Sequence, residues 1–121
     1  MKKIILISMV LFWAFSAQAQ TEELLIGKWK LEKWTKKGEE QDIVSKFKTD
    51  EVYQVFEGDA KFKSLIGDKE TKGSWKLSKD EKSLTISVMV VKAKFDIEYI
   101  DDKKRVISSK QGTFEYKKVE D

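Results

Sequence analysis

Apolar and polar residues alternate along most of this chain, and this pattern restricts the fold more than any other feature. The alternation is clearest at Leu84, Ile86 and Val88, and it returns at Phe95 and Ile97. A period of two residues places alternate side chains on one face, which is typical of half-buried β-strands. Turn-forming residues recur about every ten residues, the spacing of a chain of short strands. The sequence therefore predicts an all-β protein.

The segments between these turns correspond to eight expected strands. Their ranges are 25–36, 51–57, 60–66, 70–78, 82–90, 92–100, 103–110 and 112–119. Only the stretch from Glu39 to Phe47 departs from the alternation, because its apolar residues have the spacing of one or two turns of amphipathic helix. Sequential strands joined by short turns pair as an antiparallel meander, and closure of the meander removes its exposed edges. We therefore expect an eight-stranded up-and-down barrel, with a short helical or irregular segment between its first two strands.

The first nineteen residues have the pattern of an export signal. Lys2 and Lys3 precede an apolar run from Ile4 to Phe15, and Ala17-Gln18-Ala19 has the small residues of a cleavage site. The alternative, an uncleaved anchor, requires a longer apolar run. We therefore expect residues 1–19 to be a cleaved signal peptide and residues 20–121 to form one barrel domain.

The absence of cysteine bears on where the exported product resides. Without cysteine there is neither a disulfide nor a lipid-bearing cysteine at the cleavage point. We expect a periplasmic or secreted protein that is not a lipoprotein and that has no membrane span after signal cleavage.

Charge and composition exclude several classes of function. The net charge of +3 includes Lys2 and Lys3, and the remaining lysines are interleaved with acids. A nucleic-acid-binding protein needs a concentrated basic face instead. The chain has no histidine and no cysteine, which excludes the usual nucleophilic triads, zinc sites and histidine-ligated haem. Asp96 and Glu98 alternate with apolar residues and should face water. We expect no catalysis, cofactor, metal or nucleic-acid partner.

Two similar pentapeptides carry a resemblance to a known family. "GKWKL" begins at Gly27, "GSWKL" begins at Gly73, and the chain closes with "GTFEYKKV" at residues 112–119. This ordered set resembles the bacterial lipocalin-like domain proteins, which are short exported barrels. The resemblance implies a lipocalin-like barrel that binds a small ligand. The chain is shorter than ordinary lipocalins and lacks their disulfide and C-terminal helix.

The two Gly-x-Trp motifs predict different positions in the barrel. Glycine allows the backbone to approach another strand closely, and the tryptophan two residues later points to the same face. Trp29 should plug one end, and direct stacking on a ligand is the alternative. Trp75 should stand nearer the middle of the wall, as the floor of a cavity or as a side chain that fills it. Trp34 has the opposite parity unless a bulge intervenes.

The inward-facing residues are predicted to line a ligand cavity. They are Trp29, Leu31, Phe62, Ile66, Trp75, Leu77, Ile86, Val88, Phe95 and Ile97, with Phe114 or Tyr116 as further candidates. Such a lining holds an acyl chain or a sterol-like ring by burial, whereas the alternative is that these side chains fill a narrow barrel. Arg105 is the single arginine. It either pairs with a ligand carboxylate inside the barrel or lies outside among its charged neighbours.

The end opposite Trp29 is apolar and is predicted to be the mouth. The predicted lid and rim residues are Ile43, Val44, Phe47, Leu65, Met89, Val90 and Val91. The run from Val88 to Val91 lacks a turn residue, so it is a buried strand, the apolar lip of an open mouth, or a surface patch that recruits another protein. Two functions remain: a carrier or sensor of a small apolar ligand, and a filled barrel that acts as a protein-interaction or inhibitor module in the cell envelope.

Overall fold

The structure is a computed structural model that describes residues 21–120. The predicted signal peptide, residues 1–19, lies outside the described residues. A short helical turn at residues 21–25 precedes the first strand. No helix within residues 21–120 has the length and apolar character that crossing a membrane requires.

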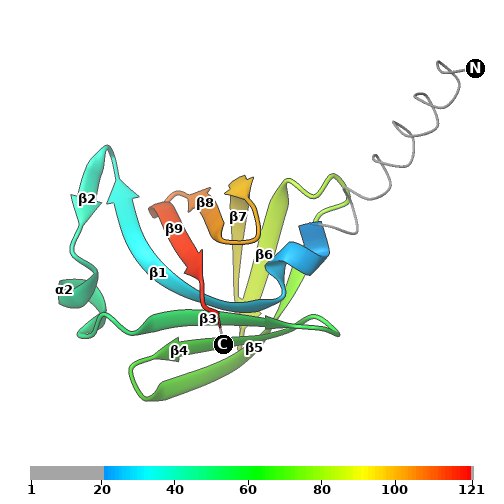
Figure 1. Cartoon of the computed structure of the whole chain (residues 1–121), viewed down its shortest axis with the longest axis horizontal. Helices are drawn as coiled ribbons and strands as arrows, with labels where there is room; N and C mark the ends of the chain where they lie inside the picture. Colours follow the sequence, from blue (N-terminus) through cyan, green and yellow to red (C-terminus); the bar gives the residue numbers. More distant parts are fainter. Residues whose placement is uncertain (1–20, 121) are drawn as a thin grey trace, which may run out of the picture.

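Eight strands form a closed antiparallel barrel (Figure 1). The elements in chain order are β1 (Gly27–Lys36), β2 (Glu39–Gln41), α2 (Ile43–Phe47), β3 (Val52–Glu57), β4 (Lys61–Ile66), β5 (Lys69–Leu77), β6 (Ser83–Val88), β7 (Val91–Ile100), β8 (Lys104–Ser109) and β9 (Gly112–Lys118). From β3 onward each strand pairs with the next, and β9 pairs back with β1. The eight-stranded meander and the short helix between its first two strands are confirmed.

The strand β2 was not predicted. Lys37 and Gly38 have φ values of 52° and 79°, and two left-handed residues make the tight turn that suits a hairpin. The turn reverses the chain, so Glu39, Glu40 and Gln41 pair with the last residues of β1. These three residues carry no apolar alternation, which is why the sequence pattern did not indicate a strand. Helix α2 begins only after them.

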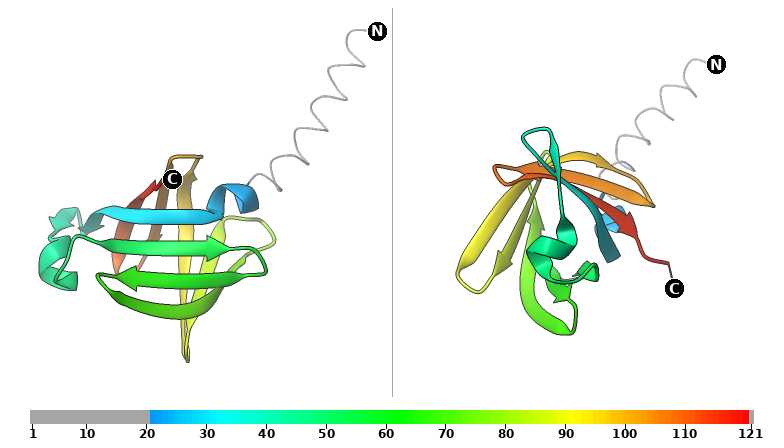
Figure 2. Two further views of the ribbon diagram at one scale, coloured as in Figure 1. Left: turned by 60° about the horizontal axis from the view of Figure 1, so that its bottom comes forward. Right: turned by 90° about the vertical axis from the view of Figure 1, so that its left-hand side faces the viewer.

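Helix α2 is fixed at both ends by its own residues. The Asp42 carboxylate accepts hydrogen bonds from the backbone N–H groups of Val44 and Ser45, at 3.1 and 3.4 Å, as an N-cap residue does. Lys48 ends the helix in the left-handed conformation, with φ 67°. The helix lies at the end of the barrel away from the start of β1, as Figure 2 shows.

The inner faces of the strands form one hydrophobic core. Its buried members are Leu25, Trp29, Leu31, Val52, Phe56, Phe62, Trp75, Leu84, Ile86, Ile107, Phe114 and Tyr116. A bulge in β1 between Leu31 and Lys33 changes the parity of the strand. Trp34 therefore also faces inward, where its ring stacks on Phe114 with centroids 5.8 Å apart.

Trp29 is completely buried at one end of the barrel. Its indole N–H donates a hydrogen bond to the Leu25 carbonyl oxygen at 2.8 Å, and the Lys118 ammonium lies 4.6 Å from its ring centre. A Cβ on Gly27 would stand 2.5 Å from Cε of Lys118, and Gly27 also has a φ of 133°. The first Gly-x-Trp motif thus needs its glycine mainly for this positive φ, because the flexible end of Lys118 could move aside.

Trp75 lies nearer the Trp29 end than the middle of the wall, which corrects the prediction. Only two residues of β5 follow it. Its indole N–H donates to the Glu57 carbonyl oxygen at 3.0 Å, and its ring meets Phe56 edge to face at 5.9 Å. A Cβ on Gly73 would stand 2.2 Å from the Ser87 carbonyl oxygen. The second motif therefore uses its glycine for close approach of β5 to β6.

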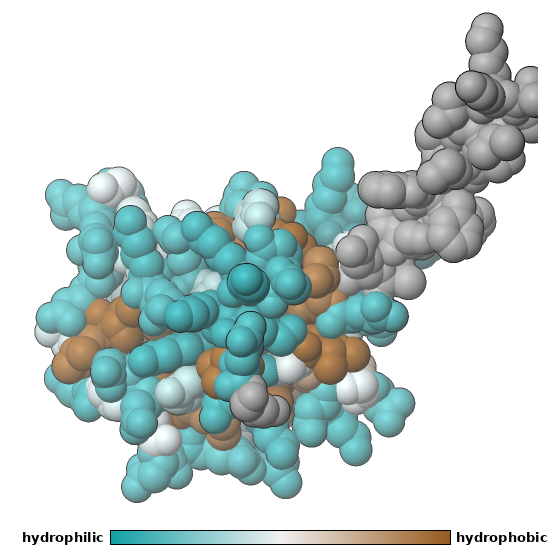
Figure 3. Space-filling model, in the orientation of Figure 1, coloured by the Kyte–Doolittle hydropathy of each residue, from teal (hydrophilic) through white to brown (hydrophobic). Residues whose placement is uncertain are grey.

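The outer surface is largely hydrophilic, as Figure 3 shows for one face of the molecule. Asp96 and Glu98 are exposed on it, as the alternation predicts. Two clefts of about 500 Å³ each lie on the outer surface. One includes Lys30, Tyr53 and Lys117, and the other lies beside Leu77 and Lys79. Neither cleft is lined by Arg105.

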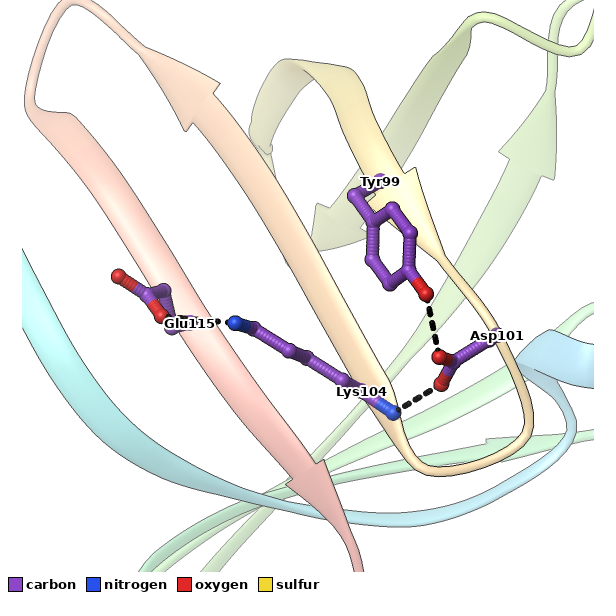
Figure 4. Close-up of polar contacts among 4 residues, drawn as sticks. All are labelled: Tyr99, Asp101, Lys104 and Glu115. Carbon is purple, nitrogen blue, oxygen red and sulfur yellow. Dashed lines mark hydrogen bonds and ion pairs between the residues drawn. The ribbon is translucent and has the colours of Figure 1, made fainter.

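The turn between β7 and β8 is organised by one carboxylate (Figure 4). The Tyr99 hydroxyl donates to Asp101 at 2.5 Å, and the backbone N–H groups of Lys103 and Lys104 donate to it at 2.8 and 2.7 Å. The Lys104 ammonium also lies 3.5 Å from a carboxylate oxygen of Glu115 on β9. These hydrogen bonds, that of Tyr99 foremost, lower the pKa of Asp101 below its ordinary value of 3.8.

We expect Asp101→Ala to lower the melting temperature near neutral pH. Because the pKa of Asp101 is lower in the folded than in the unfolded state, its stabilising effect is complete above pH 3.8 and is lost as the pH falls through the folded-state pKa. The difference in melting temperature between variant and parent should therefore shrink in acid, as measured by circular dichroism. Asp102→Asn, on the exposed neighbour, is the control. A difference that is constant with pH would contradict this role.

Candidate ligand-binding site

Arg105 lies inside the barrel and not on its surface. It is the second residue of β8, it alternates with the buried Ile107, and it pairs with Tyr116 of β9. Its side chain is completely buried, and it is the one buried charged side chain among residues 21–120. Of the two interpretations of the sequence, the inward one is correct.

Three aromatic rings surround the Arg105 guanidinium group. Its Cζ atom lies 4.1 Å from the ring centre of Tyr116, 4.7 Å from that of Phe56 and 5.0 Å from that of Trp29. Aromatic faces attract a cation, most strongly where water is excluded. The rings come from β9, β3 and β1, so barrel closure assembles this environment.

The hydrogen bonds of Arg105 are incomplete. Nη2 donates to the side-chain oxygen of Gln54. Nε and Nη1 are buried and have no hydrogen-bond partner, and no carboxylate within residues 21–120 forms an ion pair with the guanidinium group. Buried charged groups are ordinarily paired. Two nitrogen atoms of this buried cation are therefore left as unsatisfied hydrogen-bond donors.

Burial changes the pKa of both ionisable groups at the site. It lowers the pKa of Arg105 well below its ordinary value, to about 10, so the guanidinium group remains positively charged at neutral pH. Burial also raises the pKa of Tyr116, against the opposing effect of Arg105, so Tyr116 remains a neutral phenol. The inside of the barrel thus carries one uncompensated positive charge.

The predicted lining residues all occupy the inner face together with Arg105. Trp29, Leu31, Phe62, Trp75 and Ile86 belong to the buried core. The other five are partly buried against it: Ile66, Leu77, Val88, Phe95 and Ile97. Partial exposure of Ile66 and Val88, the last residues of β4 and β6, marks the end of the barrel away from Trp29.

The sequence prediction missed Gln54, the hydrogen-bond partner of Arg105. Gln54 stands between the inward-facing Val52 and Phe56 on β3, and it pairs in register with Trp29 of β1 and Ser64 of β4. The signal was present in the sequence, because a polar residue at an inward position needs a partner inside. Phe56 was missed as well, although it continues the same alternation.

The predicted lid is only partly as expected. Ile43 and Phe47 of α2 pack against the core, and the Phe47 ring lies 6.4 Å from that of Trp34. Val44 points outward and is 51% exposed. Leu65 is also outward, because its neighbours Ser64 and Ile66 take the inward positions; it pairs with Tyr53 of β3. Val44 and Leu65 are therefore not part of the inner rim.

The run from Val88 to Val91 forms a tight turn and not a buried strand. Met89, Val90 and Val91 are 89%, 96% and 62% exposed. The hairpin of β6 and β7 projects away from the barrel and from α2 in both views of Figure 2. The prediction that this run and α2 together form a lid and rim is therefore wrong.

Comparisons with known proteins agree with this architecture. A family model described as a lipocalin-like domain matches residues 25–116. A lipocalin-like protein from Bacteroides uniformis is 16% identical, with a TM-score of 0.65 over 79% of this chain and 99% of its own. An uncharacterized protein from Bacteroides eggerthii is 15% identical, with a TM-score of 0.65 over 78% and 99% of the two chains. The curated proteins contain no match. At these identities the structures support the fold alone, whereas the match over most of the barrel shows that the chain belongs to the lipocalin-like domain family.

Proposed function

We propose that this barrel binds a small apolar molecule that bears a carboxylate, and that it carries or senses this molecule without catalysing a reaction. The observation that supports the proposal is Arg105, which is completely buried while two of its nitrogen atoms lack acceptors. Carboxylates are among the acceptors that arginine binds strongly, through two parallel charge-assisted hydrogen bonds, and a carboxylate suits an otherwise apolar interior.

The energetics of Arg105 favour a functional over a structural role. Each unsatisfied buried donor costs about 1–3 kcal/mol, and desolvation of the charge adds to that cost. The aromatic rings contribute roughly 0.5–2 kcal/mol each, which offsets this cost only in part. Strongly perturbed ionisable groups gather at functional sites for this reason. A bound anion would satisfy the donors and compensate the charge.

The arrangement of the barrel suggests how the ligand is oriented. Its carboxylate would lie beside Arg105 and Gln54, on the side of the barrel plugged by Trp29. Its apolar part would extend towards Ile66 and Val88, at the ends of β4 and β6, and be held by burial. Helix α2 has five residues, none of them fully buried, so its displacement would expose the interior at small cost.

We also propose that the protein works outside the cytoplasm, on the basis of the signal-peptide pattern in residues 1–19. An interaction or inhibitor module remains the second interpretation of the sequence. The observation that bears on this second interpretation is the β6–β7 turn, whose exposed residues could contact another protein.

A pair of matched ligands tests the proposal. We expect a saturated fatty acid to quench or shift the tryptophan fluorescence of the delipidated protein and to raise its melting temperature. The primary alcohol of the same chain length should bind about ten-fold more weakly or worse, because it cannot form charge-assisted hydrogen bonds with Arg105. Equal affinity for acid and alcohol would contradict the anionic head group. No response to either, or to sterol and aromatic acids, would contradict ligand binding.

A further inference from the structure

The turn between β6 and β7 presents three apolar side chains to solvent. Met89, Val90 and Val91, together called the apolar tip, are 89%, 96% and 62% exposed. Met89 also has a φ of 57°, a left-handed conformation that glycine or asparagine adopts more readily. None of these three side chains is part of the barrel core. Strain of this kind commonly accompanies a functional segment.

Lysines gather on the outer face of the sheet beside the apolar tip. The basic face comprises Lys61, Lys63, Lys72, Lys76, Lys92 and Lys94, which alternate with inward-facing residues on β4, β5 and β7. Across the sheet, Lys76 and Lys94 both pair with Thr85, while Lys92 pairs with Ser87. The intervening strand β6 therefore presents only small hydroxyl side chains between the lysines.

Few acids offset this charge close to the tip. The outer face of the same strands carries Glu70, Asp96 and Glu98, and the last two lie towards the far end of β7. On the neighbouring β3, Glu57 forms an ion pair with Lys63 at 3.9 Å. Lys92 and Lys94 are both exposed and stand directly beside the tip. An apolar projection next to a basic surface is complementary to a bilayer with anionic head groups.

We propose that the apolar tip inserts into the interface of an anionic phospholipid membrane while the basic face contacts the lipid phosphates. The shape of the surface favours a membrane over a protein partner. A stable protein interface buries about 800 Å² on each side, whereas this tip is the narrow end of the β6–β7 hairpin (Figure 2) and exposes three apolar side chains. This inference is independent of ligand binding inside the barrel.

Vesicle binding tests the proposal. We expect the protein to sediment with vesicles of phosphatidylglycerol and phosphatidylcholine, and not with vesicles of phosphatidylcholine alone. Replacing Lys92 and Lys94 by glutamine should weaken binding about 25-fold, because each lysine near an anionic surface contributes about five-fold. Lys36→Gln with Lys37→Gln, on the β1–β2 hairpin, is the matched control and should bind like the parent.

A second pair of variants tests insertion separately from charge. Met89→Asn with Val90→Thr, which leaves the net charge unchanged, should abolish binding without lowering the melting temperature, because asparagine tolerates a positive φ. Val44→Asn is the control for an exposed apolar residue elsewhere. The chain has no cysteine, so Val90→Cys can carry a single environment-sensitive fluorophore. Its emission should shift to the blue with anionic vesicles, whereas a label at Lys37→Cys should not respond.

Three results would overturn the proposal. The first is failure of the parent protein to bind anionic vesicles. The second is binding that survives the tip substitutions, which would mean attraction by charge alone without insertion. The third is an unchanged emission of the label at residue 90 in the presence of vesicles. A tip that instead binds a protein would give the first and third results together.

Discussion

The variant Arg105→Met should lose its affinity for acidic ligands while the ligand-free protein remains as stable as the parent or becomes more stable. Methionine has a similar volume and fits among the rings of Trp29, Phe56 and Tyr116 without a charge. Replacement of a buried ionic group by an apolar one is often neutral or stabilising by about 1–4 kcal/mol. The affinity for a fatty acid should fall to that for its alcohol, because the residue that distinguishes them is gone.

Urea unfolding and ligand titration together measure this result. The variant Ile107→Ala is a useful comparison, because it shortens a completely buried apolar residue on the same strand and should destabilise by about 2–5 kcal/mol. A comparable loss in Arg105→Met would show that the arginine is part of the structural core, and retention of acid binding would show that it does not recognise the ligand.

Trp29→Ala should cause the largest loss of stability of any substitution considered. Truncation of a large buried aromatic residue costs about 3–5 kcal/mol. Here it would also leave the Leu25 carbonyl oxygen without its donor and remove the ring from beneath Lys118. Domains of this kind have a total stability of about 5–15 kcal/mol. We therefore expect a large fall in the urea midpoint, and in the least stable case a protein that does not fold.

Substitution of a second tryptophan shows whether the loss of stability depends on the position in the barrel or only on the type of residue. Trp34 is partly exposed near the opposite end of the barrel, although it stacks on Phe114. Trp34→Ala should therefore lower the midpoint by clearly less than Trp29→Ala. Equal losses from the two substitutions would contradict the role of Trp29 as the plug.

The strands were predictable because their period is local. Alternation in residues 82–88, for example, needs no knowledge of neighbouring strands, and every predicted strand lies within a few residues of the observed one. Features that depend on pairing were harder to predict. The bulge between Leu31 and Lys33, which turns Trp34 inward, arises from the register of β1 with β9. The strand β2 contains no apolar residue, so the alternation pattern could not indicate it.

The candidate site also combines a feature that local alternation predicts with features that depend on other strands. The parity of Arg105 with Ile107 indicated an inward position, but burial of the charge depends on what faces it. Gln54 and the three rings come from β3, β1 and β9, and nothing within β8 indicates them. The turn at Met89 lacks the glycine or asparagine that usually marks such a position, so the pattern could not separate a buried strand from an exposed tip.

The pairing of β1 with β9 has a consequence for how the chain folds. Trp29 pairs with Lys118 and Trp34 with Phe114. One edge of the first strand pairs early with β3, but its other edge can pair fully only when the last strand is available. Contacts between such distant residues slow folding, typically to milliseconds or seconds for β-proteins of similar size. Until that partner arrives, one edge of β1 has unpaired backbone groups and attracts other chains. Molecular chaperones that cover β1 should therefore raise the yield of refolding more than those that bind the middle strands.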